Sequence, residues 1–155
     1  MNPSFDGNKV TCSKRSGAAV AGRLALFSFN SASARSWLQL FARTAGKAIL
    51  AWLPEDEMRR ILAGGMKRYT DKTITDFAAL FESLRVVRRN GFALDGEEYL
   101  PGVICVGAAI RDQAGTVIGA ISASTPAMRA TDEHIALMRD EIAAATRALS
   151  AEYGE

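Results

Sequence analysis

Residues 102–124 read GVICVGAAIRDQAGTVIGAISAS, and this stretch decides the fold. Two apolar runs of strand length, 102–110 and 116–124, are joined by the polar segment 111–115. That spacing is typical of a β-hairpin, and Gly115 at the end of the loop supplies the positive φ that such connections usually require. The stretch therefore predicts two neighbouring antiparallel strands.

Three helices are expected before this hairpin. The first covers 44–53, with the basic Lys47 directed to solvent, and the second begins at Pro54 and is stopped by Gly64 and Gly65. The third runs over about 73–89, where apolar residues recur at spacings of three and four and form one stripe. The stripe consists of Ile74, Phe77, Leu80, Phe81, Leu84 and Val87.

A short extended segment, 91–94, precedes the hairpin, and one more helix follows it. Thr131 is the expected N-cap of that helix, and acidic residues occupy its first turn. One helix face is apolar and carries Ile135, Met138, Ile142, Ala145 and Leu149. The order of elements is helices, then a meander of strands, then a helix. This order predicts the α+β class, with an antiparallel sheet covered by helices.

The chain has 155 residues, 48% of them hydrophobic, which indicates one compact domain. Its formal charge of +2 gives no strong field for gripping a phosphate backbone. Residues 1–36 are rich in Ser, Ala and Gly without a sustained period, so we predict a poorly ordered leader there and the packed domain over 37–155. A signal peptide is disfavoured because it would start late and contain Arg23.

Several classes of site are not indicated by the sequence. Cys12 and Cys105 lie far apart and outside any Cys/His cluster, so we expect no disulfide framework, no metal, no cofactor and a reducing cytoplasm. No apolar run reaches the roughly 18 residues that cross a bilayer, so no membrane contact is expected. His134, the single histidine, has no evident nucleophile to serve and is assigned to the surface.

Polar side chains interrupt the predicted strands. In segment 116–124, alternation places Ser122 and Ser124 on one face with Ile118 and Ala120, and the other face holds Val117, Gly119, Ile121 and Ala123. A buried unpaired hydroxyl costs on the order of 1–3 kcal/mol. The serines either bond neighbouring backbone or water, or line a small polar pocket. By themselves, Cys105 indicates a core thiol and Asp95 a turn aspartate that bonds its own backbone.

Four motifs resemble the sensing domain of IclR-type bacterial transcription regulators, in both order and spacing. They are TAGKAILA at 44–51 with LPE at 53–55, GFALDGEE at 91–98, GVICVGAAI at 102–110 and AISASTP at 120–126. The similarity runs from about Leu38 to the C-terminus. It implies a GAF-like domain, in which a curved antiparallel sheet and its helices enclose a small organic or aromatic acid.

The resemblance also implies which residues contact this effector. Backbone amides of the helix start at Thr44, Ala45 and Gly46 would meet the ligand, as helix N-termini meet anions. The pocket side chains would be those of Asp95, Val103, Cys105, Ser122 and Ser124. Hydroxyls and a thiol can bond a carboxylate or keto group without opposing its charge. Asp95 would then be protonated, paired, or bonded to a ligand hydroxyl.

The sequence departs from the family at several points. Residues 1–36 resemble neither the helix-turn-helix nor the linker helix nor the first strands, which predicts a sheet that is incomplete at its N-terminal strands and has an exposed edge. Thr125 stands where the family usually has Gly. Phe41 and Arg43 replace small or polar residues just before the first helix, and all three changes are expected at the pocket mouth.

The function implied is an effector-binding module whose occupancy shifts a conformational or assembly equilibrium. Self-association, or association with full-length homologues, is expected, and DNA would be reached only through a partner that carries the helix-turn-helix. Two alternatives stay open. A thiol-based enzyme would use Cys105 as nucleophile, which a thiol reagent on the native protein discriminates. A ligand-free dimerisation decoy would mix with a full-length homologue in size-exclusion chromatography.

Overall fold

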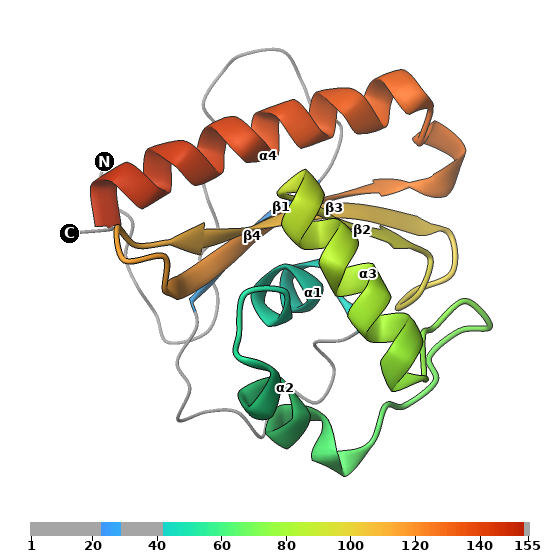
Figure 1. The fold of residues 1–155 in the computed structure, drawn as a ribbon. Coiled ribbons are helices and arrows are strands. Elements are labelled where there is room, and N and C mark those ends of the chain that lie inside the picture. The colour runs from blue at the N-terminus through green and yellow to red at the C-terminus, as the bar shows by residue number, and fades with distance from the viewer. Residues whose placement is uncertain (1–22, 29–41, 154–155) are drawn as a thin grey trace.

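The computed structural model describes residues 42–153 and the backbone of residues 23–28. The fold is α+β, as predicted. Four antiparallel strands form one sheet in the order β1-β4-β3-β2 (Figure 1). The strands are β1 (Arg23–Ser28), β2 (Ala93–Gly96), β3 (Val103–Arg111) and β4 (Val117–Pro126).

Helices cover both faces of the sheet. The α-helices are α1 (Thr44–Leu50), α2 (Glu55–Ile61), α3 (Phe77–Asn90) and α4 (Asp132–Tyr153), and the 3-10 turns are η3 (Leu62–Gly64) and η4 (Ala127–Arg129). The long α4 crosses one face alone, while α1 lies on the other face with α3 beside it (Figure 1). We call these the α4 face and the α1 face.

The predicted hairpin is confirmed. Strands β3 and β4 pair antiparallel, and their connection is closed by Asp112, whose amide donates to the Thr116 carbonyl over 2.9 Å. The Asp112 carboxylate accepts from the Thr116 amide at 2.8 Å, and Gly115 has φ 84. The aspartate and the glycine therefore fix the turn, as their preferences for turn conformations require.

The final helix is also confirmed. Thr131 caps it by accepting the His134 amide at 3.2 Å. On the α4 face, Met138 and Ile142 are buried, and Ile135, Ala145 and Leu149 pack around them against Val106, Ala108, Ile121 and Ala123. The surface assignment of His134 is wrong in part, because its side chain is half-buried and Nε2 has no partner within the described residues.

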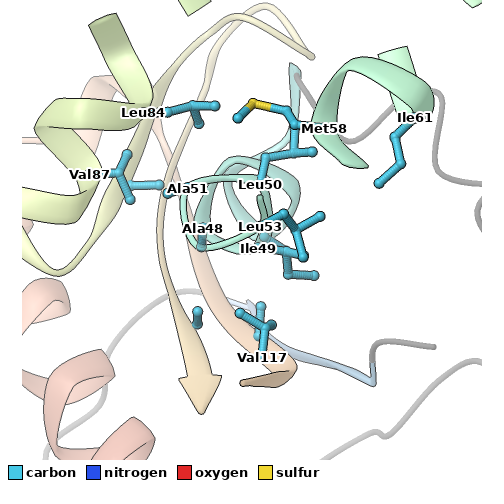
Figure 2. Close-up of a cluster of buried hydrophobic side chains, with 14 of the residues drawn as sticks. Ala48, Ile49, Leu50, Ala51, Leu53, Met58, Ile61, Leu84, Val87 and Val117 are labelled. Atoms are coloured by element: carbon cyan, nitrogen blue, oxygen red, sulfur yellow. The ribbon is translucent and has the colours of Figure 1, made fainter. Parts of the chain in front are cut away.

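The larger core lies on the α1 face, where α1 is buried all round between the sheet and helices α2 and α3 (Figure 2). Val117 belongs to this core, although strict alternation predicted that it shares a face with Ile121 and Ala123. The cause is an irregularity in the β3–β4 pairing next to Ile110, which turns the strand before Gly119. Uniform alternation therefore fails at the start of β4.

Helix α3 begins later than predicted. Asp76 caps it by accepting the Ala79 amide at 2.9 Å, whereas Thr73 lies before the helix. The Thr73 hydroxyl instead accepts the amides of Tyr69 and Thr70 and donates to the Glu98 carbonyl at 2.6 Å. The side chain that was expected in the first turn is thus used to hold a loop. Gly91, at φ 79, ends α3 where predicted.

Strand β1 corrects the prediction for the N-terminal segment. No strand was expected within residues 1–36, yet 23–28 pairs with β4 in continuous antiparallel register. The edge of β4 is therefore covered rather than exposed, because β4 offers unpaired backbone groups that any extended segment can satisfy. Residues 1–22 and 29–41 lie outside the described residues, and with them Cys12, Phe41 and most of the disfavoured signal peptide.

Candidate functional site

The four polar side chains singled out on the strands lie in one place on the α1 face. Asp95 on β2 is opposite Cys105 on β3, and Cys105 is opposite Ser124 on β4. One step along, Gly107 is opposite Ser122. Cross-strand neighbours project to the same side of a sheet, so these residues form a band across three strands. We call Asp95, Cys105, Ser122 and Ser124 the polar row.

The start of α1 lies directly over this row. A side chain on Gly107 would come within 3.2 Å of the Cβ atoms of both Thr44 and Ser122, so the missing side chain lets the helix approach the strand. Thr44, Ala45 and Gly46 are all buried. The first amide bonded within the helix is that of Lys47, to the Arg43 carbonyl at 2.9 Å, so the preceding amides have no helical partner.

The row contains two serine hydroxyls. Ser122 and Ser124 are half-buried, and neither hydroxyl has a hydrogen-bond partner within the described part of the chain. Neither serine hydroxyl bonds neighbouring backbone among the described residues, and bonding to water stays an alternative to a ligand pocket. Val103, the fifth predicted pocket residue, is half-buried at the first position of β3, opposite Pro126, and borders the row at one end.

Asp95 combines a structural hydrogen bond with a raised pKa. It is 3% exposed, and its Oδ1 accepts the Glu98 amide at 2.6 Å, as expected of a turn aspartate. Burial raises its pKa to about 6, since the opposing hydrogen bond from Glu98 and the positive charge of Lys47 do not outweigh the lost hydration. The carboxyl group therefore exchanges its proton near the physiological range.

The solvent-facing orientation predicted for Lys47 is wrong. Its side chain is 1% exposed and pairs with Glu98 at 2.5 Å, while Glu98 comes from the loop between β2 and β3. Because α1 is enclosed on all sides, the ammonium group of Lys47 can be accommodated only beside a carboxylate. The sequence signal that could have shown this is an apolar helix with no polar face on which a lysine could be solvated.

Arg43, noted only as a departure from the family pattern, also lies at this site. One Nη donates to the Tyr99 hydroxyl at 2.7 Å, and the guanidinium carbon stands 4.1 Å from the centre of the Tyr99 ring. Its charge also acts on Cys105. Thr125, the second described departure, follows Ser124 directly, so it lies on the opposite face and does not belong to the pocket mouth.

The thiol of Cys105 is poorly suited to nucleophilic chemistry. Burial and the negative charge of Asp95 raise its pKa, and a hydrogen bond from Thr44 and the charge of Arg43 offset only part of this. The thiolate form is therefore scarce near neutral pH, and the thiolate is the reactive species.

The family model described as "Bacterial transcriptional regulator IclR C-terminal" matches residues 30–151 of the chain. The chain belongs to the IclR family. The match includes all eight predicted site residues.

Three relatives of this IclR-family chain illustrate the similarity. The HTH-type transcriptional regulator BhcR of Paracoccus denitrificans is 42% identical over 112 residues, which are 72% of this chain and 40% of BhcR. The structure of the C-terminal domain of E. coli KdgR is 36% identical, with a TM-score of 0.70 and coverage of 75% of this chain and 71% of that domain. The inducer-binding domain of a PobR double mutant from Acinetobacter, in complex with 3-hydroxybenzoic acid, is 26% identical, with a TM-score of 0.63, and the match covers 75% of this chain and 65% of that domain.

The IclR-family chain spans only about two fifths of the length of the curated relatives it matches. Within its described residues, no helix is both long and apolar enough to cross a membrane, and no group of three or more His, Cys, Asp or Glu side chains could hold a metal ion. An open depression of about 300 Å³ lies outside the polar row, lined by Thr70, Asp71, Lys72, Glu97 and Pro101.

Proposed function

We propose that this chain binds a small organic acid as the effector of an IclR-type regulator of transcription, and that the polar row together with the start of α1 forms the binding site. One observation carries the proposal: two half-buried hydroxyls, which have no hydrogen-bond partner in the described part of the chain, stand beside a thiol and a buried carboxyl group, under a helix start. A folded protein rarely leaves such groups unbonded unless water or a ligand completes them.

The chemistry of the row favours a ligand that carries both a carboxylate or keto oxygen and a hydroxyl. The serine hydroxyls and the amides at Thr44 to Gly46 donate to the former, and the Asp95 carboxylate accepts from the latter. Because α1 has only seven residues, its free amides matter more than its dipole. The PobR domain, solved with a hydroxybenzoic acid, is a related domain with a ligand of this class.

Effector occupancy would act on transcription through assembly. A ligand that binds one arrangement of the domain better than another shifts their populations by its differential affinity. We propose a cytoplasmic protein that associates with copies of itself or with full-length homologues, so that a partner's helix-turn-helix carries the response to DNA. The chain is not proposed to be an enzyme, in keeping with the regulator names of its relatives.

Thermal unfolding against a panel of small carboxylic and aromatic acids tests the site. An acid at about 100 times its dissociation constant should stabilise the fold by roughly 2.7 kcal/mol, a rise in melting temperature on the order of 10 °C. Ser122→Ala and Ser124→Ala should remove most of that rise. Ser150→Ala is the matched control. Ser150 lies on α4, away from the row, and its hydroxyl accepts a hydrogen bond from the Arg111 amide at the end of β3.

Two results would contradict the proposal. If the chain unfolds cooperatively and no acid raises its melting temperature, the proposal of an acid effector for this site is rejected. An acid that stabilises both serine variants as strongly as the unaltered chain would place its binding elsewhere.

A further inference from the structure

Among the described residues around the polar row, one of the two cations is not paired with an anion. Lys47 is neutralised by Glu98 at 2.5 Å. Arg43 has no carboxylate within 4.0 Å among the described residues, and its Nε is buried without a hydrogen-bond partner. A guanidinium group held in this state has a donor and a charge that an added anion would satisfy together.

Arg43 is the N-cap residue of α1, at the helix start that lies over the row. It directly precedes Thr44, whose Cβ lies 3.2 Å from where a Gly107 side chain would begin and whose side chain hydrogen-bonds the Cys105 thiol. The positive charge of Arg43 lowers the pKa of Cys105 against the effect of burial, so the guanidinium acts electrostatically on the middle of the row. Tyr99 holds the guanidinium from its ring face and its hydroxyl, which restricts the orientation of the remaining donors.

Other arginines in the molecule show what a purely structural role looks like. Arg88 donates to the carbonyls of Ala51 and Leu53 and so caps the end of α1. Arg111 stacks on Trp52 at 3.7 Å from the ring centre. Arg43 stacks in the same way but keeps a buried donor unused, and this difference separates it from both.

We propose that Arg43 selects an anionic effector by pairing its guanidinium with the carboxylate of a ligand that lies on the Cys105–Ser124 part of the row. The inference rests on the proposed function and adds to it a specificity residue that lies outside the predicted contact set. A planar guanidinium matches a carboxylate better than an ammonium does, and it discriminates an acid from its uncharged amide by charge as well as by hydrogen bonding.

The test compares acids with their amides on the full chain. The probes are 3-hydroxybenzoate, benzoate and pyruvate, each against its own amide, and binding is read as protection of Cys105 from iodoacetamide in a Cys12→Ser background. The unaltered site should bind the preferred acid about tenfold or more tightly than its amide. Arg43→Met and Arg43→Gln should bring that ratio close to one, and Arg43→Lys should retain part of it.

Arg111→Met is the matched control, because it removes a similar ring contact away from the row and should leave the ratio unchanged. A merely structural Arg43 would weaken acid and amide equally in its variants, so an unchanged ratio in Arg43→Gln would overturn the inference while leaving the proposed function in place. Equal binding of acid and amide by the unaltered chain would also overturn the inference and leave the proposed function in place. If no probe protects Cys105, both the inference and the proposed site are rejected.

Discussion

The two faces of the sheet are built on different principles. On the α4 face, one long amphipathic helix packs apolar side chains onto Val106, Ala108, Ile121 and Ala123. The α1 face holds, beside its apolar core, a buried ion pair, a carboxyl group at 3% exposure and two half-buried hydroxyls without a hydrogen-bond partner among the described residues. The apolar cluster on the α4 face therefore follows the rule for stability, whereas the α1 face accepts several polar groups, which cost stability unless they are hydrogen-bonded or paired.

The difference teaches where to look for function in this domain. Periodicity explains the six buried apolar residues of the α4 cluster, although the same face also carries the buried hydroxyl of Thr125, which has no partner among the described residues. On the α1 face, Lys47 and Asp95 bond other protein groups, and the proposed function assigns the two serine hydroxyls to a bound molecule. The following predictions separate these two kinds of polar group.

The largest effect is expected at the buried ion pair. Lys47→Met leaves the Glu98 carboxylate without its partner and should lower the free energy of unfolding by about 3–5 kcal/mol, which chemical denaturation measures. Changing Glu98 to Met as well should recover most of the loss, because two apolar side chains replace two paired charges. A double variant as unstable as the single one would show that Lys47 acts by packing rather than by pairing.

Asp95 should make the α1 face sensitive to pH. Its pKa is raised from 3.8 to about 6 on folding, so between these values the folded state binds more protons than the unfolded state. The free energy of unfolding should then fall as pH rises from about 4 to about 6, by at most about 3 kcal/mol, and this contribution should stay constant above that window.

Asp95→Asn removes this dependence while its amide oxygen can still accept the Glu98 amide. The variant should therefore be more stable than the unaltered chain at pH 7 and similar to it near pH 4, in denaturation curves recorded across this range. An unchanged pH profile in the variant would assign the titration to another group.

The smallest effects come from exchanging serine and alanine between the faces. Ser124→Ala removes an unpaired hydroxyl from the α1 face and should change stability by less than about 0.5 kcal/mol in the absence of ligand. Ala123→Ser, one residue earlier, inserts a hydroxyl into the α4 cluster and should cost about 1–3 kcal/mol. Similar costs for the two changes, measured by thermal unfolding, would remove the distinction between the faces.

Most secondary-structure elements follow from local pattern, and the errors have identifiable causes. The hairpin around Gly115 and the final helix behind Thr131 were predicted, because turn preferences and amphipathic spacing are local properties. The late start of α3 at Asp76 was missed, because Thr73 satisfies a distant carbonyl of Glu98 instead of its own helix. Strand β1 was missed because its pairing with β4 depends on an edge, not on its own composition.

For the candidate site, the resemblance to the family supplied the residues and the fold supplied their surroundings. The sequence by itself determined the α+β class, the α4 face and which side chains would stand on the strands, since each depends on the order of residues within one element. The tertiary structure alone decided that Lys47 is buried against Glu98, that Thr44 bonds Cys105, and that Arg43 keeps an unpaired donor beside them. Lys47 and Glu98 are 51 residues apart in the chain, and no local pattern encodes a contact at such a separation.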